Sequence, residues 1–254
     1  MKIDLKDVTF CIPIFIDSPE RLENVKCTLK FLHNNFDAKF SVCEYVNIGR
    51  NFNWDIGQIL TAPCLTHVFD EDVAFSRTEA INKAITHPGV KTPYIAIYDV
   101  DVIFDAENIL KAVKLLRAGF TLTYPYSGKF IDIERSYIKD GIIKPVSDSY
   151  VLKSYGGACF LNREDYFKCG LENEHLIGGH VPDDVERLSR IQKLGFPIER
   201  VEGNCYHINH PPGPDMGNRN KLKDKNEAEY KKVNNMTKNE LITYIETWPW
   251  KTLK

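Results

Sequence analysis

Two aspartates separated by one residue, Asp99 and Asp101, form a D-x-D motif and are the side chains most suited to chemistry in this sequence. They follow an apolar run, Tyr94–Tyr98, that begins after Pro93. Such a run is typical of a strand buried on both faces of a parallel sheet. At the carboxyl end of that strand, where open α/β sheets bind ligands, a divalent cation and a diphosphate would stabilise the two charges. A turn that caps the strand is the simpler alternative.

A second pair of carboxylates, Asp183 and Asp184, follows a glycine-containing segment that ends at Pro182. The apolar spacing after the pair predicts a helix over 183–194, with both aspartates in its first turn. Aspartates favour helix starts through capping and the macrodipole. A helix start also holds a carboxylate rigidly and keeps it ionised, as a general base requires. We expect the buried face of this helix to consist of Val185, Leu188, Ile191 and Leu194.

Two histidines three residues apart, His207 and His210, end a predicted strand and enter a Pro-Pro loop. This placement indicates metal ligands, although a structural role is common for a single histidine. Imidazole nitrogen combined with carboxylate oxygen would favour manganese over magnesium. Farther upstream, Gly156 and Gly157 precede an apolar strand, where paired glycines let the backbone approach a ligand or another strand. A β-bulge at a sheet edge is the alternative for the glycine pair.

The elements that must position these side chains alternate between strands and helices. Ser18 and Pro19 predict the N-cap and first position of one helix, and Asp105 and Gly119 predict the start and end of another. This alternation predicts βαβ units, a mostly parallel sheet and therefore an α/β fold. Further predicted strands and helices lie over 10–16, 40–46, 66–69, 76–86 and 120–124, and residues 125–150 form a connecting hairpin or excursion.

Composition narrows the class of protein. The 254 residues suffice for one large α/β domain or two fused lobes, and a net charge of −2 disfavours nucleic-acid partners. No segment has the length of apolar residues that a membrane span needs, and the charged start differs from a signal peptide. Seven scattered cysteines without C-x-x-C spacing favour reduced thiols in a cytoplasmic protein. The polar tail over 218–254 is expected to pack on its own domain or a partner through Leu241, Ile242, Tyr244, Ile245, Trp248 and Trp250.

In their order along the chain, these features resemble the GT-A glycosyltransferases, particularly the galactosyltransferase and chondroitin-polymerase-like group. The resemblance covers residues 8–230 and implies a three-layer α/β/α sandwich with a Rossmann-like nucleotide-binding sheet. It implies one GT-A domain over 1–217, with a nucleotide-sugar half (1–124) and an acceptor and catalytic half (125–217), followed by a helical tail (218–254). The motifs that carry it are Pro13, Phe75-Ser76-Arg77, Asp99-Val100-Asp101, Tyr155-Gly156-Gly157, Gly179 to Asp184, His207 or His210, and Lys225-Asn226-Glu227.

The same resemblance implies a UDP-sugar donor bound through Mn²⁺ or Mg²⁺. The metal would be held by Asp101 and a histidine, with His207 slightly preferred over His210. Asp99 would bind ribose or sugar hydroxyls, or the metal through water. The implied donor site consists of Pro13, Phe15 and Asp17 around the uridine, Arg21 nearby, Arg77 at the diphosphate or donor sugar, and the Tyr155-Gly156-Gly157 turn at the sugar.

The catalytic base implied by the resemblance is Asp184, and Asp183 would hold acceptor or donor hydroxyls. The family's Gly-Trp-Gly-Gly loop is Gly179-His180-Val181-Pro182 here, and its Glu-Asp pair is Asp-Asp. The implied activity is inverting transfer of a hexose or N-acetylhexosamine to a hydroxyl of a glycan or glycolipid, in synthesis of a bacterial surface polysaccharide. Separately from the resemblance, the amphipathic tail over 218–254 allows peripheral membrane association.

Three alternatives compete with this interpretation. A non-catalytic sugar-nucleotide-binding subunit would keep the fold without turnover. A sugar nucleotidyltransferase needs a glycine-rich phosphate loop after the first strand, and Ile14-Phe15-Ile16-Asp17 contains no glycine. A histidine-based zinc hydrolase would need a third ligand that the sequence does not indicate.

Overall fold

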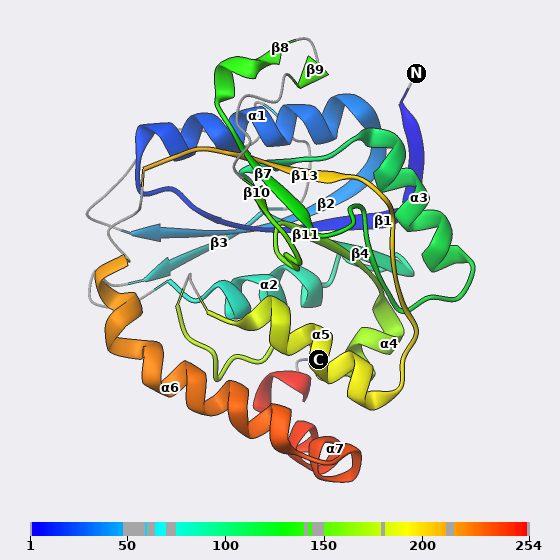
Figure 1. Ribbon diagram of the computed structural model, residues 1–254, viewed down its shortest axis with the longest axis vertical. Coiled ribbons are helices and arrows are strands. Elements are labelled where there is room, and N and C mark those ends of the chain that lie inside the picture. Colours follow the sequence, from blue (N-terminus) through cyan, green and yellow to red (C-terminus); the bar gives the residue numbers. More distant parts are fainter. Residues whose placement is uncertain are drawn as a thin grey trace.

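A seven-stranded sheet with the order β12-β6-β11-β4-β1-β2-β3 forms the centre of the molecule (Figure 1). Within it β11 runs antiparallel to both neighbours, while the other adjacent strands are parallel. The structure is a computed structural model that describes residues 2–47, 59, 64–69, 75–139, 142–143, 150–178, 181–211 and 216–252. The strands are β1 (Ile3–Phe15), β2 (Phe36–Asn47), β3 (Cys64–Phe69), β4 (Tyr94–Tyr98), β6 (Leu122–Tyr124), β11 (Ala158–Asn162) and β12 (Ile198–Arg200).

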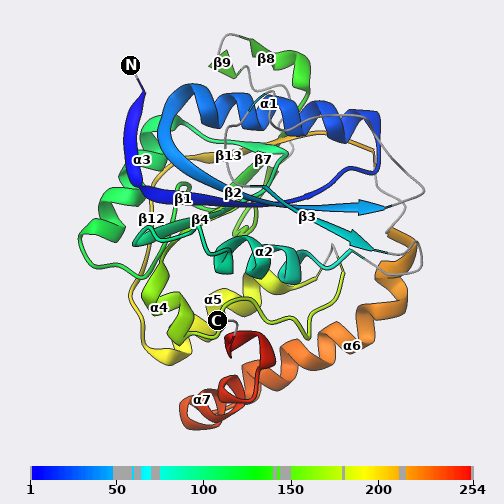
Figure 2. The ribbon, with the colours of Figure 1, turned by 180° about the vertical axis from the view of Figure 1, so that it is seen from behind.

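Helices cover both faces of this sheet. Helices α1 (Pro19–Asn35) and α3 (Ala106–Arg117) lie on one face, as Figure 1 and Figure 2 show. Helices α2 (Arg77–Thr86), α4 (Arg163–Lys168) and α5 (Asp183–Leu194) lie on the other. The α/β class, the three layers and the mostly parallel sheet are therefore confirmed.

Local side-chain hydrogen bonds cap two helices at the predicted residues. The Ser18 hydroxyl accepts from the Arg21 backbone N–H at 3.1 Å, and Pro19 occupies the first turn of α1. The Asp105 carboxylate accepts from the Glu107 backbone N–H at 3.1 Å at the start of α3. Each cap satisfies a backbone donor that the first helical turn leaves free. Gly119, with a φ of +106°, lets the chain turn after α3.

A smaller sheet brings the histidine strand beside the D-x-D turn. Its order is β10 (Tyr150–Val151), β7 (Lys129–Ile133), β13 (Asn204–Ile208) and β5 (Val102–Ile103). In this sheet His207 pairs with Val102 on one side and with Asp132 on the other. The excursion predicted over 125–150 therefore supplies β7 to this sheet. It also contains two short strands, β8 (Ile138–Lys139) and β9 (Ile142–Ile143), which pair with each other.

Helix α5 has the predicted bounds, but one prediction about its buried face is wrong. Val185 is 39% exposed, because it lies in the first turn and lines the cavity described below. Leu188, Ile191 and Leu194 are buried as expected. Two arginines, Arg187 and Arg190, share the buried side of the helix, together with Asp183 and Glu186. The apolar spacing alone gave no indication of these buried charges.

The tail packs on its own domain. Helices α6 (Met216–Asn235) and α7 (Lys238–Glu246) run beneath α5 in Figure 1. Leu241, Ile245, Trp248 and Trp250 are buried, and the Trp250 indole donates to the Gly170 carbonyl at 3.1 Å. Ile242, at 42% exposed, departs from the expected packing. None of the described helices combines the length and apolarity needed to cross a membrane.

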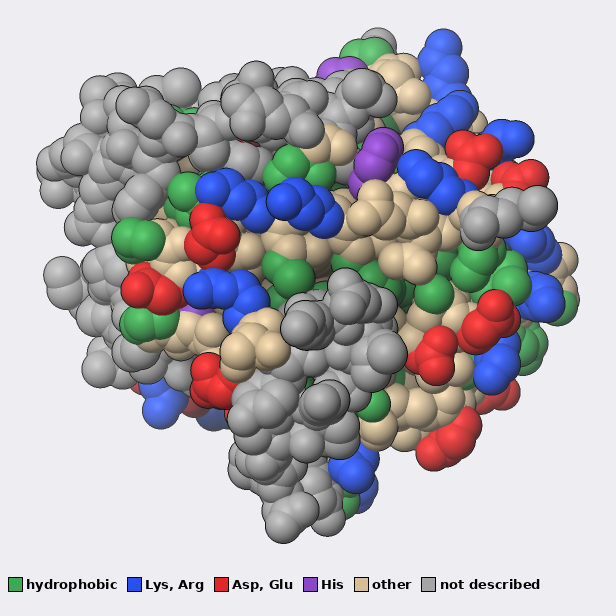
Figure 3. Space-filling model, turned by 90° about the horizontal axis from the view of Figure 1, so that it is seen from above, with side chains coloured by type: hydrophobic (Ala, Val, Ile, Leu, Met, Phe, Trp, Pro, Cys, Tyr) green, Lys and Arg blue, Asp and Glu red, His purple; other side chains and the backbone are tan. Residues whose placement is uncertain are grey.

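The described cysteines and one face of the surface can be compared with the composition. Cys11 and Cys159 are buried in the core, and six described cysteines are free thiols. Figure 3 shows basic and acidic side chains interspersed over the coloured part of one face. Such mixing provides no single-sign field for a polyanion on that part of the surface.

Candidate active site

A cavity of about 560 Å³ lies beyond the carboxyl ends of β1 and β4. Open α/β sheets bind ligands at this edge. The cavity brings together residues that are as much as 197 positions apart, from Pro13 to His210. Every site residue proposed from the sequence lines it: Pro13, Phe15, Asp17, Arg21, Arg77, Asp99, Asp101, Tyr155, Gly156, Gly157, Asp183, Asp184, His207 and His210. Gly179 and His180 of the glycine segment lie outside the described residues.

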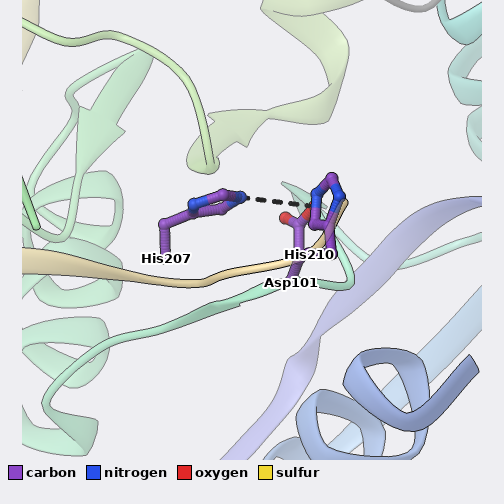
Figure 4. Close-up of side chains that lie close together, drawn as sticks. All are labelled: Asp101, His207 and His210. Carbon is purple, nitrogen blue, oxygen red and sulfur yellow. Dashed lines mark hydrogen bonds and ion pairs between the residues drawn. The ribbon is translucent and has the colours of Figure 1, made fainter. Parts of the chain in front are cut away.

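Asp101, His207 and His210 form a cluster with metal-ligand chemistry. Figure 4 shows both imidazoles near the carboxylate. The Asp101 Oδ2 lies 3.2 Å from His210 Nε2 and 3.7 Å from His207 Nε2. One candidate ligand atom from each residue lies within 4.8 Å of the others. A cation could therefore contact all three side chains, so both histidines are candidate ligands.

The outer nitrogens of the two imidazoles have acceptor partners. His207 Nδ1 lies 2.7 Å from Asp132 Oδ1, and His210 Nδ1 lies 2.9 Å from the Pro211 carbonyl oxygen. A proton on each Nδ1 satisfies these acceptors and leaves Nε2 directed toward Asp101. A longer 3.4 Å contact joins Arg21 Nη2 to His210 Nδ1, and the nearer carbonyl determines the tautomer. Carboxylate or carbonyl partners of this kind orient metal-bound histidines, so the residues fit a divalent cation.

The electrostatics of the cluster also match a cation site. Against the opposing effect of burial, hydrogen bonds with His207 and His210 hold the pKa of Asp101 below its ordinary value. Burial lowers the pKa of His207. Hydrogen bonds and charge interactions with Asp101 and Asp132 outweigh this effect and raise the pKa of His207 to about 9. Near neutral pH the metal-free cluster therefore holds a protonated imidazole. A cation would displace that proton on binding.

The opposite wall of the cavity is an arginine–carboxylate cluster. Arg77, at the start of α2 and 9% exposed, donates from Nη2 to Asp99 Oδ1 at 2.7 Å and from Nη1 to Asp183 Oδ2. Its Nη1 also lies 3.6 Å from Asp184 Oδ1. Burial raises the pKa of Asp183 to about 7, and burial with nearby Asp101 and Asp184 raises that of Asp99. Arg77, predicted to contact the donor, therefore has its guanidinium directed at carboxylates of the protein.

The paired glycines permit close approach between the backbone and Asp184. A Cβ on Gly156 would lie 2.9 Å from Asp184 Oδ2, which is too close for a side chain. Gly157 has a φ of +84°, and its carbonyl accepts from the Asp99 backbone N–H at 2.8 Å. Strand β11 pairs with strands on both sides, so the alternative of a β-bulge at a sheet edge is wrong.

An aromatic pair forms the remaining described wall. Phe15 stacks on Phe75 with ring centroids 5.2 Å apart and an interplanar angle of 13°. Near them, Arg21 Nε donates to Asp17 Oδ1 at 2.9 Å, and Arg21 Nη1 lies 3.8 Å from Asp101 Oδ2. Apolar rings beside fixed polar groups are typical of small-molecule sites.

Sequence reasoning missed several residues of the site. Asp132 orients His207, and its only local signal is an acid within the short apolar run Lys129–Ile133. Phe130, whose ring centroid lies 5.3 Å from that of His207, belongs to the same run. Lys153 lines the cavity in a left-handed backbone conformation with a φ of +62°, which no local pattern indicated.

Neither protein-family models nor curated proteins gave a match to this sequence. Among solved structures, one similar to this chain is Drosophila beta-1,4-galactosyltransferase 7 in complex with manganese, UDP-Gal and xylobiose. It is 17% identical, with 80% of this chain and 71% of that chain covered and a TM-score of 0.48. Another is glucosyl-3-phosphoglycerate synthase from Mycobacterium tuberculosis in complex with Mn²⁺, UDP and phosphoglyceric acid. It is 14% identical, with 95% of this chain and 79% of that chain covered and a TM-score of 0.49.

Proposed function

We propose that this chain is a metal-dependent inverting glycosyltransferase that moves a hexose or an N-acetylhexosamine from a UDP-sugar to a hydroxyl of a glycan or glycolipid. The observation that carries the proposal is the shared cavity. A cluster suited to a cation (Asp101, His207 and His210) and an accessible carboxylate (Asp184, 24% exposed) line the same space. Metal-dependent inverting transfer from a nucleotide sugar uses both functions on one substrate, the cation at the leaving diphosphate and the carboxylate at the attacking hydroxyl.

The metal end would serve the leaving group. Asp101, His207 and His210 would hold Mn²⁺ or Mg²⁺, and Asp99 would bind ribose or sugar hydroxyls or reach the metal through water. A bound cation neutralises the negative charge that develops on the departing diphosphate. Asp132 and the Pro211 carbonyl keep the two imidazoles oriented for this role.

The α5 end would serve the acceptor. Asp184 would take the proton from the acceptor hydroxyl as its oxygen bonds to the anomeric carbon, while the bond to the UDP oxygen breaks on the opposite face. The electron pair of that bond leaves with UDP, and the single displacement inverts the anomeric configuration. Asp183, held by Arg77, would present its other oxygen to acceptor or donor hydroxyls.

The donor would lie along the remaining walls. Pro13, Phe15, Asp17 and Arg21 would surround the uridine, and Tyr155-Gly156-Gly157 would adjoin the sugar. Ser154 lines the cavity immediately before this turn, and its small side chain supports UDP-GalNAc and UDP-GlcNAc beside UDP-galactose as candidate donors. Comparing turnover of the three donors tests this steric argument, and preference for plain galactose would remove it.

The proposal includes the organisation and setting of the chain. Residues 1–217 would form one GT-A domain, in which 1–124 bind the nucleotide sugar and 125–217 supply the acceptor and catalytic half. Residues 218–254 would be a helical tail that allows peripheral membrane association. We place the enzyme in the cytoplasm, in synthesis of a bacterial surface polysaccharide, on the basis of its composition and family resemblance.

Substitution of the proposed base tests the function. Asp184→Asn should lower Mn²⁺-dependent turnover of the preferred UDP-sugar by about 10²–10⁴-fold, the usual contribution of positioned proton transfer. UDP affinity, measured by calorimetry with Mn²⁺ present, should stay within about threefold because the diphosphate end is unchanged. Asp165→Asn is the control, because Asp165 is partly exposed like Asp184 but lies on α4 and does not line the cavity. A variant that retains most of its rate would remove Asp184 from this role.

The second candidate is a sugar-nucleotide-binding subunit without turnover. It is favoured by one observation, since Arg187 and Arg77 already engage Asp184 Oδ1. In that case UDP and Mn²⁺ would bind, but no UDP-sugar would be turned over or hydrolysed by wild-type protein.

A further inference from the structure

Two arginines on the buried side of α5 differ in what they contact. Arg187 donates from Nη2 to Asp184 Oδ1 and from Nη1 to Glu172 Oε1 at 2.6 Å. Arg190 instead pairs with Glu186 at 2.8 Å and 3.0 Å, and its guanidinium lies 5.2 Å from the Trp248 ring centroid. Both arginines are at most 1% exposed, but only Arg187 is joined by these contacts to the cavity.

Glu172 is fixed independently of the cavity. It is fully buried, the Tyr166 hydroxyl donates to its Oε1, and its backbone N–H donates to Asn82 Oδ1 at 2.9 Å. Arg187 therefore connects Asp184 to a rigid anchor. Because the anchor is an anion, it offsets the positive charge that Arg187 brings toward Asp184.

The Arg187–Glu172 pair is poorly suited to stability alone. Arg187 Nε and Glu172 Oε2 are buried without a hydrogen-bond partner among the described atoms. Buried ion pairs often contribute no more stability than apolar residues of similar volume, and buried unpartnered polar atoms are costly. A purely structural role does not explain why charge is placed here.

We propose that Arg187 is a positioning residue for Asp184, held in place by Glu172, so that one carboxylate oxygen is fixed and the other is presented to the acceptor hydroxyl. This inference rests on the proposed function. Nη2 occupies Oδ1 of Asp184, while Oδ2 lies beside Gly156, whose missing Cβ leaves room for it. A fixed carboxylate needs less reorganisation when the proton is transferred.

The charge on Asp184 depends on groups from several elements. Arg77 at the start of α2 and Arg187 on α5 favour its ionised form. Acidic neighbours oppose it: Asp183 on α5, Asp99 after β4, and Glu172 behind Arg187. Tyr124, Tyr126 and Cys159 also lie near Asp184, and burial raises the pKa of each, which keeps them uncharged. Without Arg187, Arg77 would be the one cationic side chain left beside Asp184 among the described residues.

The test compares Arg187→Met with Arg187→Lys and with the matched control Arg190→Met. The probe is Mn²⁺-dependent hydrolysis of UDP-galactose, or of the preferred donor, with water in place of the acceptor and Mn²⁺ saturating. In Arg187→Met, kcat should fall by about 10–100-fold, the scale of one charge-assisted hydrogen bond. KM for the donor should stay within about twofold, and the acid limb of the kcat profile should move to higher pH. Arg187→Lys should restore part of kcat and reverse part of the shift in the acid limb.

The control separates positioning from packing. Arg190→Met removes an equally buried guanidinium from the same helix, so it should lower thermal stability without moving the acid limb or kcat per folded molecule. Equal effects of the two methionine variants on kcat and on the pH profile would overturn the proposal. An unmoved acid limb in folded Arg187→Met would overturn it as well.

A second variant keeps the proposal testable if Arg187→Met does not fold. Glu172→Gln keeps the side-chain shape but leaves the charge on Arg187 less offset, so the acid limb should move to lower pH, opposite to Arg187→Met. A shift to higher pH or no shift would contradict the proposal. Failure of the proposed function is distinct, because it would appear as an active Asp184→Asn variant whatever the Arg187 variants do.

Discussion

At one end of the cavity Asp101 faces two imidazoles, whereas at the other Asp99 and Asp183 face the guanidinium of Arg77. Both ends hold carboxylates, and both supply cationic partners for them. The partners differ in whether they can give up their charge. Imidazole loses its proton within the range that proteins experience, and guanidinium does not.

This difference assigns separate tasks to the two ends. A metal can replace the proton on His207, so the histidine end can exchange one cation for another. The Arg77 end keeps its cation permanently, so its carboxylates stay oriented whether or not substrate is present. The histidine end is suited to a metal ion that arrives with the nucleotide. The Arg77 end is suited to holding carboxylates in a fixed position for the reacting hydroxyl.

The largest expected effect comes from removing the permanent cation. Arg77→Met leaves the buried Asp183 without its arginine partner and removes the ion pair of the partly exposed Asp99, so the free energy of unfolding should fall by about 3–5 kcal/mol. Chemical denaturation of the metal-free protein measures it. Arg117→Met, which removes the exposed ion pair with Asp7, is the control and should change stability by about 1 kcal/mol or less. Similar losses in both variants would mean that burial at the Arg77 end does not set the cost.

The next largest effect concerns the histidine end, where a metal can replace a proton. Asp101→Asn removes the only carboxylate of the candidate metal cluster among the described residues. Because substitution of an outer-shell partner alone costs about 10–100-fold in metal affinity, loss of this ligand should cost more than about 100-fold. Calorimetric titration with Mn²⁺ measures it. Asp183→Asn, across the cavity, should keep Mn²⁺ affinity within about threefold, and a comparable loss there would place the cation elsewhere.

The fold could be predicted further than the site because its signals are local. The apolar run Tyr94–Tyr98, the Ser18 cap and the Gly119 stop after α3 each report on neighbouring residues, and each element formed where expected. The first strand is longer than predicted, since β1 begins at Ile3 and its polar early residues pair with β2. Polar residues in a strand interrupt the apolar pattern without preventing ladder hydrogen bonds.

Only those site residues that belong to a recognisable sequence motif could be predicted. Asp101 and His207 were recognisable from type and spacing, but Asp132 was not, because its role arises from pairing between β7 and β13 across 75 residues. Arg187 was hidden for a different reason. A buried arginine at a helical position has the polarity of a surface residue, so apolar periodicity assigns it to solvent.

A smaller effect should follow from substituting Asp132, the carboxylate that orients His207. Asp132→Asn keeps the size of the side chain but weakens its contact with His207 Nδ1, which should lower Mn²⁺ affinity by about 10–100-fold. Glu134→Gln is the matched control on the same segment, because Glu134 contacts Asn209 and not a candidate ligand. Calorimetry under identical conditions compares the two. Equal affinities in wild type and Asp132→Asn would show that His207 does not depend on this partner.

The most direct test of exchange is the pH dependence of Mn²⁺ affinity, whose expected change is the smallest for a single pH unit. With the pKa of His207 raised to about 9, the cation must displace one proton at any lower pH. Apparent affinity should therefore rise by about tenfold for each pH unit between pH 6.5 and 8.5 and level off above the pKa. His207→Asn should bind more weakly and with a shallower slope, since that proton is gone. An unchanged slope would assign the displaced proton to another group and leave His207 outside the exchange.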